Sequence, residues 1–216
     1  MKMLGYGVLG VLLAACLGGC VGMADMTSRM GGLGVVSEKV STFDGATIVE
    51  VSPQFVHDPK HTGWGFNSYK LGARWNSNSP EYVALIMSYS SSADNVGSIY
   101  TSLTGIDVNL NGQKYSFEAG GATSHGNDGW NDLSKTIYTN SQNTVVVPLE
   151  FLQEMTVTED CTIRIHSSDG YEDALFSMER RPGGQGLALM SIREFLSKVK
   201  NKRQILAVGD TAGSGG

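Results

Sequence analysis

Three side chains of the kind that bind metal ions lie close together in the sequence: His57, Asp58 and His61. Two histidines four residues apart can hold zinc from one face of a helix. However, Pro59 lies between them and Gly63 follows, and both residue types disfavour a helix. With no third ligand nearby in the sequence, we expect a solvated loop between strands, with no metal site and no cofactor.

Ser124, His125 and Asp128 have the residue types of a hydrolytic triad and lie in the glycine-rich stretch Gly120–Trp130. A nucleophile, a base and an orienting acid must contact one another. Adjacent side chains such as Ser124 and His125 seldom do so, and the sequence has no Gly-x-Ser-x-Gly elbow. We therefore expect a polar loop over a packed Trp130 and no enzyme. The alternative is a hydrolase that uses this loop.

Two further patterns are better explained as turns and strand ends. Asp169-Gly170 with Asp173 lacks the spaced carboxylates of a calcium loop. Gly183–Gly186 precedes a helical pattern but lacks the Lys-Ser/Thr end of a phosphate-binding loop. We expect the neighbouring Arg180 and Arg181 to form a solvated strand end.

Four aromatic residues lie within twelve positions, among glycines and polar residues: Trp64, Phe66, Tyr69 and Trp75. Aromatic side chains supply large apolar areas, so packing into the core is the favoured interpretation. The alternative is an exposed contact surface for a protein or a glycan, made by Trp64, Phe66 and Tyr69.

The first residues have the pattern of a secretory signal peptide. Met1 and Lys2 form a basic start, the stretch Met3–Ala24 carries no charge, and its apolar core ends near Leu17. A transmembrane helix is the alternative, because the uncharged stretch is long enough to span a bilayer. Several glycines dilute its hydropathy, so we favour a cleaved leader.

The end of this leader carries a more specific signal. Leu17-Gly18-Gly19-Cys20 resembles the lipobox of bacterial lipoproteins, an aliphatic residue and two small residues before a cysteine. The resemblance implies that the Cys20 thiol receives a diacylglycerol and that cleavage occurs just before it. Leu13-Ala14-Ala15-Cys16 matches the same pattern, but would give a very short leader. An ordinary signal peptide with incidental cysteines is the remaining alternative.

Cys161 has no disulfide partner if Cys20 is acylated and Cys16 is removed with the leader. Three cysteines are also too few for a disulfide scaffold. We expect Cys161 to be a small buried apolar residue, because no cationic group is placed to activate its thiol.

Two hairpins are predicted from alternating apolar residues around a turn. Asn111-Gly112 is the strongest hairpin signal and pairs Val108 with Tyr115 and Ile106 with Phe117. The second hairpin follows Cys161, with Asp169-Gly170 as its turn. Counting outward from that turn predicts the pairs Ile165–Ala174, Ile163–Phe176, Cys161–Met178, Arg164–Leu175 and His166–Asp173.

The remaining elements follow from periodicity. Strands are expected over residues 47–52, 70–75, 82–89 and 143–147, and a short helix over 148–155. An apolar stripe at helical spacing predicts a C-terminal helix; it consists of Ala188, Ile192, Phe195, Leu196 and Val199.

We predict a mainly β fold, an antiparallel β-sandwich-like domain with a C-terminal amphipathic helix; an α+β arrangement is the alternative. Residues 1–19 would be the signal peptide, 20–40 the lipidated cysteine and a flexible tether, 41–200 the single domain, and 201–216 a disordered tail. The order of elements resembles a loose group of uncharacterised bacterial envelope lipoproteins. The resemblance is carried by Val145–Leu152, Asp169-Gly170 and Ile192–Leu196, and it implies no activity.

The chain has 16 basic and 21 acidic residues among 216, a formal net charge of −5, unlike a general nucleic-acid binder. We expect a membrane-anchored envelope protein with a non-enzymatic binding or structural role and an envelope protein or glycan as partner. The alternatives are a periplasmic hydrolase and a small-ligand carrier. Because Val21 and not Asp follows Cys20, we expect the periplasmic face of the outer membrane, if the source is Gram-negative.

Overall fold

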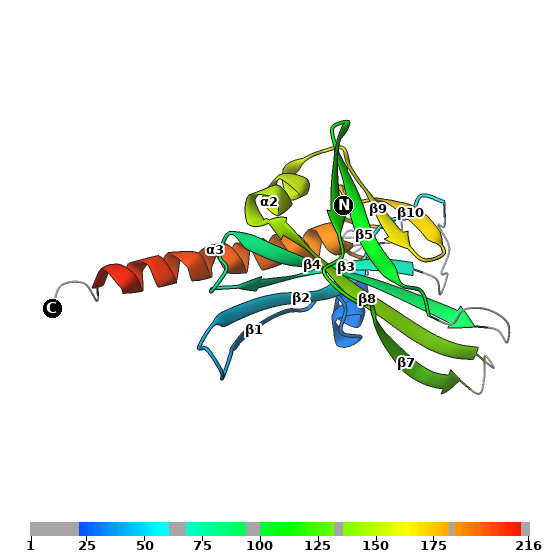
Figure 1. The fold of residues 1–216 in the computed structure, drawn as a ribbon, viewed down its shortest axis with the longest axis horizontal. Helices are drawn as coiled ribbons and strands as arrows, with labels where there is room; N and C mark the ends of the chain where they lie inside the picture. The colour runs from blue at the N-terminus through cyan, green and yellow to red at the C-terminus, as the bar shows by residue number, and fades with distance from the viewer. Residues whose placement is uncertain (1–21, 61–67, 94–99, 132–135, 182–183, 213–216) are drawn as a thin grey trace, which may run out of the picture.

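The computed structural model describes residues 22–60, 68–93, 100–131, 136–181 and 184–212 (Figure 1). It confirms a mainly β fold built from two antiparallel sheets and a C-terminal helix. The larger sheet has the order β1 (Val36–Val40), β2 (Thr47–Phe55), β3 (Ser68–Asn76), β4 (Tyr82–Ala93), β8 (Thr136–Pro148), β7 (Ser124–Asn131). The smaller sheet has the order β10 (Gly170–Leu175), β9 (Cys161–Ser167), β5 (Leu103–Leu110), β6 (Gln113–Glu118). The four strands expected from periodicity lie within β2, β3, β4 and β8.

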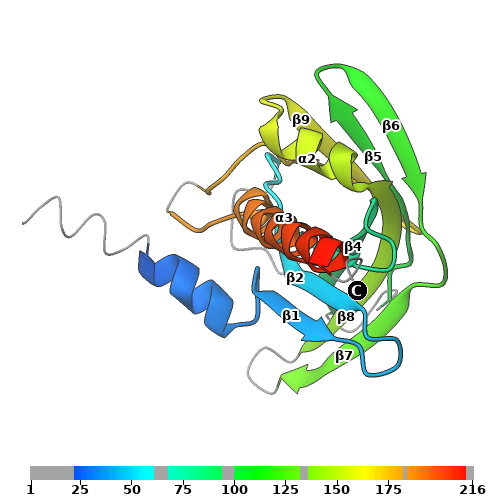
Figure 2. The ribbon, with the colours of Figure 1, turned by 90° about the vertical axis from the view of Figure 1, so that its left-hand side faces the viewer.

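The larger sheet curls into a half-barrel around the C-terminal helix (Figure 2). The pairing of β2 with β3 shifts register between Val51 and Gln54, which marks a β-bulge. Gly72 of β3 lies against this bulge, where a Cβ atom would meet the Val51 carbonyl oxygen at 2.6 Å. Glycine at this position therefore lets the two backbones approach closely enough for the sheet to bend.

The hairpin of β5 and β6 has the predicted register, with Val108 opposite Tyr115 and Ile106 opposite Phe117. Asn111 and Gly112 form its loop with φ angles of 50° and 90°. Both residue types tolerate positive φ, so the turn and the alternation agree.

The register predicted for the second hairpin is wrong by two residues. Ala174 pairs with Ile163 and not with Ile165, and Arg164 pairs with Asp173. The loop consists of Ser168 and Asp169, because the segment before β5 holds both residues. Thr101 Oγ1 donates to Asp169 Oδ2, and the Ser168 hydroxyl accepts from the Ser102 N–H. A shift of two residues keeps every side chain on its predicted face.

Helix α2 (Leu149–Val157) confirms the short helix expected over residues 148–155, with Pro148 as its N-cap residue. Helix α3 (Ala188–Ala212) confirms the C-terminal helix and lies in the concave side of the sheets, packed against β2 and β3 (Figure 2). Its predicted stripe is buried: Ala188, Ile192, Phe195 and Val199 are at most 1% exposed, and Leu196 is partly buried. These side chains join both sheets in one hydrophobic core.

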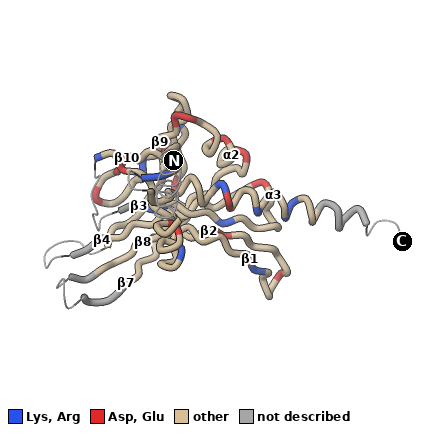
Figure 3. Tube along the Cα trace, turned by 180° about the vertical axis from the view of Figure 1, so that it is seen from behind, with Lys and Arg blue, Asp and Glu red and all other residues tan. Residues whose placement is uncertain are grey.

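The expectation of a disordered tail from residue 201 is wrong for the described part of that segment, because α3 continues to Ala212. Lysine, arginine, glutamine and leucine are good helix formers. Ion pairs also hold this part of the helix on two sides: Lys202 with Glu38 of β1 at 2.7 Å, and Arg203 with Glu81 at 2.7 Å. Charges of both signs are interspersed along the chain (Figure 3).

The flexible tether expected over residues 20–40 is also wrong where the structure describes it. Residues 22–30 form a helix, and Val36–Val40 form β1. The helix ends in a Schellman motif: Gly32 has a φ of 77°, its N–H donates to the Arg29 carbonyl, and the Leu33 N–H donates to the Ser28 carbonyl. None of the helices in the described residues is long and apolar enough to cross a membrane.

Candidate functional site

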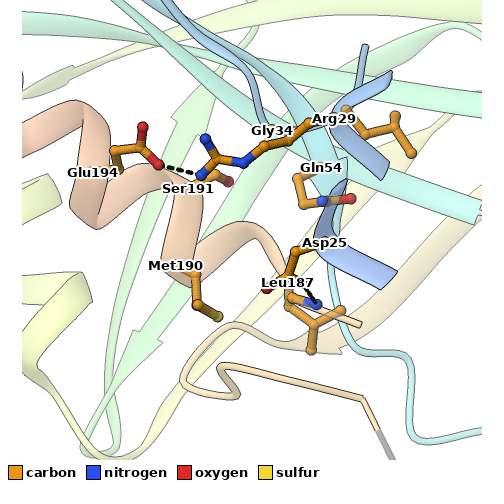
Figure 4. Close-up of a pocket in the computed structure, with 10 residues that line it drawn as sticks. Asp25, Arg29, Gly34, Gln54, Leu187, Met190, Ser191 and Glu194 are labelled. Atoms are coloured by element: carbon orange, nitrogen blue, oxygen red, sulfur yellow. Dashed lines mark hydrogen bonds and ion pairs between the residues drawn. The ribbon is translucent and has the colours of Figure 1, made fainter. Parts of the chain in front are cut away.

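The helix over residues 22–30 docks on the segment that leads into α3, and Asp25 is the centre of this junction (Figure 4). Asp25 Oδ2 accepts a hydrogen bond from Arg180 Nη2 at 2.8 Å, and Oδ1 accepts from Arg180 Nη1 at 3.2 Å. Oδ1 also accepts from the Gly186 N–H at 2.9 Å. A Cβ at residue 186 would lie 2.9 Å from Oδ1, so a larger residue there would force the Asp25 carboxylate to shift.

Two further contacts hold the same face of the helix. Arg29 forms an ion pair with Glu194 of α3, and Gln185 Nε2 donates to the Ser28 hydroxyl at 3.1 Å. Ser28 is 8% exposed, which makes it the most buried residue of this helix. The helix is therefore bound to the domain through its charged and polar face.

The charges of this junction favour the docked state. Burial raises the pKa of Asp25, but the hydrogen bonds from Arg180 and Gly186 outweigh burial, and the pKa lies below its ordinary value of 3.8. Arg180 also donates to the Gly184 carbonyl at 2.7 Å, so its guanidinium joins the helix to the loop before α3. The sequence alone predicted a solvated strand end here.

A small cavity lies behind the junction, between the helix, β2 and α3. Its polar lining includes Gln54 and Ser191, and its volume is about 70 Å³. Gly34, with a φ of 64°, closes one side of the cavity. A Cβ at this position would lie 3.2 Å from Gln54 Nε2 and 3.2 Å from Ser191 Cβ. This volume suits a few water molecules and is well below the roughly 300 Å³ of a typical small-molecule site. We interpret the junction as a structural joint.

The stretch Gly120–Trp130 is not the loop that was expected, because Ser124–Asn131 form strand β7 at the sheet edge. Successive side chains of a strand point to opposite faces, which separates Ser124 from His125. His125 Nδ1 lies 3.1 Å from Ser141 Oγ of β8, and its ring lies against Tyr100. Ser141 is only 2% exposed, so a substrate could not reach its hydroxyl. The side chains of Asp128 and Trp130 lie outside the described residues.

The cluster of His57, Asp58 and His61 is described only in part. The His57 carbonyl accepts from the Leu175 N–H at 2.8 Å, and Asp58 Oδ1 accepts from the Lys60 N–H at 2.7 Å. His61 lies outside the described residues. Within the part of the chain that the structure describes, no three His, Cys, Asp or Glu side chains are arranged to hold a metal ion.

The aromatic group is described only in part, since Trp64 and Phe66 lie outside the described residues. Tyr69 packs against Tyr89 with ring centroids 4.6 Å apart, and burial raises its pKa to about 12. Trp75 is fully buried and donates from Nε1 to the Pro80 carbonyl at 3.1 Å. Trp75 confirms the core interpretation, while the contact surface of Trp64, Phe66 and Tyr69 stays a prediction.

The open face of the smaller sheet carries a polar cluster that sequence reasoning paired differently. His166 Nε2 lies 2.9 Å from Asp107 Oδ2, whereas His166–Asp173 was the predicted pair. Asp173 instead accepts two hydrogen bonds from Arg164, whose guanidinium lies 3.9 Å from the Tyr171 ring centroid. These side chains are about a third exposed and form cross-strand pairs, which stabilise a sheet.

Cys161 is fully buried and is a free thiol, as predicted. Burial raises the pKa of this thiol to about 12, so the nucleophilic thiolate is suppressed. Sequence reasoning missed the helix over residues 22–30. Its signals were Asp25 and Arg29 four residues apart, followed by the glycine stop at Gly31-Gly32.

Comparison with models of known protein families, with curated proteins and with solved structures gave no match.

Proposed function

We propose that the protein is a lipid-anchored component of the bacterial cell envelope with a non-enzymatic binding or structural role. The observation that carries this proposal is the lipobox-like sequence Leu17-Gly18-Gly19-Cys20 behind a basic start and an apolar stretch. Two or three acyl chains on Cys20 would give durable anchoring, whereas one chain gives marginal anchoring.

The junction at Asp25 supports an anchoring role for the N-terminal segment. Cys20 precedes the described helix by only two residues. An extended chain spans at most about 3.6 Å per residue, so an acylated Cys20 lies within about 10 Å of the docked helix. The anchor would therefore hold the domain close to the membrane instead of letting it move on a long tether.

Val21 supports the outer membrane as destination, because lipoproteins of enteric-type bacteria without Asp after the cysteine usually go there. In a Gram-negative source we place the domain on the periplasmic face of that membrane. Crosslinking of the lipidated protein in its own envelope would identify the partner.

Metabolic labelling with a fatty acid tests the anchor. The wild-type protein should incorporate the label, and Cys20→Ala should not. Cys16→Ala is the matched control, because it changes a cysteine of the predicted leader and should leave the label in place. Labelling that persists in Cys20→Ala and is lost only in Cys16→Ala would move the anchor four residues upstream. No label in the wild type would contradict the proposal.

A further inference from the structure

The helix over residues 22–30 has two opposite faces. The inner face carries Asp25 and Ser28, which bond to the segment before α3. The outer face carries Met23, Met26 and Met30, whose exposed fractions are 66%, 59% and 84%. Spacings of three and four residues place these methionines in one stripe along the helix. The docked helix thus presents an apolar stripe outward.

This stripe is unusual for a surface helix, in which the apolar side normally faces the core. Here Asp25, Ser28 and Arg29 bond to the domain, and three large apolar side chains face away from it. The inner hydrogen bonds and ion pairs fix this orientation, so the exposure follows from how the helix is docked. Such an arrangement suits a helix with an apolar medium on its outer side.

The position of the stripe in the chain indicates which medium that is. Met23 is three residues after Cys20, so it lies within about 11 Å of the predicted acyl attachment. Helices that lie in a membrane interface bury their apolar face about 5–10 Å into the headgroup and acyl boundary. Met23 is therefore within reach of the bilayer surface whenever Cys20 is anchored.

We propose that the outer face formed by Met23, Met26 and Met30 lies in the surface of the lipid bilayer and orients the domain on it. This inference rests on the proposed acylation of Cys20. Methionine suits the site because its flexible thioether side chain adapts to an irregular apolar environment. A second copy of the chain is a less suitable occupant, because one nine-residue helix offers far less than the roughly 800 Å² per partner of a stable interface.

The loop between β1 and β2 should then be held away from the membrane. Figure 2 shows this loop and the helix over residues 22–30 on opposite sides of the molecule. Phe43 in this loop is fully exposed. It provides a matched control, since it is an exposed apolar residue that the proposal places in water.

The test uses the full chain, processed in a lipoprotein-producing bacterium and reconstituted in vesicles of phosphatidylethanolamine and phosphatidylglycerol. Met23→Cys, Met26→Cys and Phe43→Cys are each labelled with a fluorophore, while Cys161 is buried and Cys20 is blocked by its lipid. Brominated acyl chains in the vesicles should cause loss of emission at residues 23 and 26 and none at residue 43. The mass of the N-terminal peptide in the same sample reports acylation separately.

Unchanged emission at residues 23 and 26 in a protein that carries its acyl chains overturns the membrane-face proposal and leaves the anchor standing. Equal loss at residue 43 also overturns it, because the domain would then have no fixed orientation. Shielding of residues 23 and 26 that depends on protein concentration and needs no vesicles indicates a second copy and overturns it too. A peptide without acyl chains contradicts the anchor itself, and the membrane face falls with it.

Discussion

Asp25 accepts two hydrogen bonds from the guanidinium of Arg180, a residue 155 positions later in the chain. This contact joins the helix that follows the predicted anchor to the loop that starts α3. Since α3 packs against β2 and β3 in the core, this contact connects the N-terminal helix to the body of the domain. The strength of this junction can be measured.

Asp25→Ala should weaken the docking of residues 22–30 without unfolding the sheets. The substitution leaves the Arg180 guanidinium and the Gly186 N–H without this partner, and the contact is partly exposed. We expect a loss of about 1–2 kcal/mol of local stability. Amide hydrogen exchange over residues 23–30 should accelerate accordingly. Arg29→Ala is the control, because its exposed pair with Glu194 should contribute less than about 1 kcal/mol.

The same junction should loosen in acid. The folded pKa of Asp25 lies below its ordinary value of 3.8, so its contribution is complete above that value. The contribution is lost as the pH falls through the folded pKa and the carboxylate is protonated. The protection factors of residues 23–30, which compare the measured exchange rate with the intrinsic rate at the same pH, should therefore fall below about pH 4 in the wild type. In Asp25→Asn, the amides of residues 23–30 should already be poorly protected at pH 7. If their protection still fell in acid as it does in the wild type, other carboxylates would be the cause.

Phe195→Ala tests whether α3 is a structural part of the core. The Phe195 side chain is fully buried in the core that joins both sheets and the helix. Its truncation should cost about 3–5 kcal/mol, a large part of the stability of one domain. Ile205→Ala on the protruding end of the same helix, where Ile205 is 62% exposed, should cost little. Deletion from residue 186 onward should abolish cooperative unfolding, and an unchanged melting temperature would show that α3 is an independent arm.

Gly72→Ala tests the bend of the larger sheet. The added methyl would lie 2.6 Å from the Val51 carbonyl oxygen and 3.0 Å from the Pro53 nitrogen, both of them backbone atoms. We expect a loss of about 1–3 kcal/mol in chemical denaturation, because the bulge must shift to admit the methyl. Gly120→Ala, which has open space around the new Cβ, should be nearly neutral. Equal stability of the two variants would mean that β2 does not constrain residue 72.

The Cys161 thiol should be inert in the folded protein. Burial raises its pKa to about 12, so little thiolate exists at pH 8. Iodoacetamide should leave the peptide that contains Cys161 unmodified until denaturant unfolds the domain, as read by peptide mass spectrometry. Phe43→Cys, at a fully exposed position, should react at once under the same conditions.

Much of the fold was predictable because local signals agreed with the packing. Asn111-Gly112 fixes the β5–β6 register through its φ angles, and the apolar stripe of α3 is buried as its spacing indicates. The β9–β10 register was not predictable from the turn residues alone. Thr101 and Ser102, distant in the sequence, hold Asp169 and Ser168 and select a different loop.

The N-terminal junction was missed for a related reason. The stretch before β1 has no apolar periodicity toward the core, since its helix docks through Asp25 and Arg29. Met23, Met26 and Met30 do recur at helical spacing, but three apolar positions in a short glycine-rich stretch are a weak pattern. Likewise, pairing of His125 with Ser141 depends on the register of β7 and β8, which neither strand specifies by itself.

Acylation of Cys20 is read from the mass of the N-terminal peptide of the purified, detergent-extracted protein. We predict a peptide that begins at Cys20, carries a diacylglyceryl thioether on its sulfur and has an acylated amino group. An N-terminal peptide in which Cys20 is unmodified, or a chain that retains its leader, would contradict the anchor on which the proposed function depends.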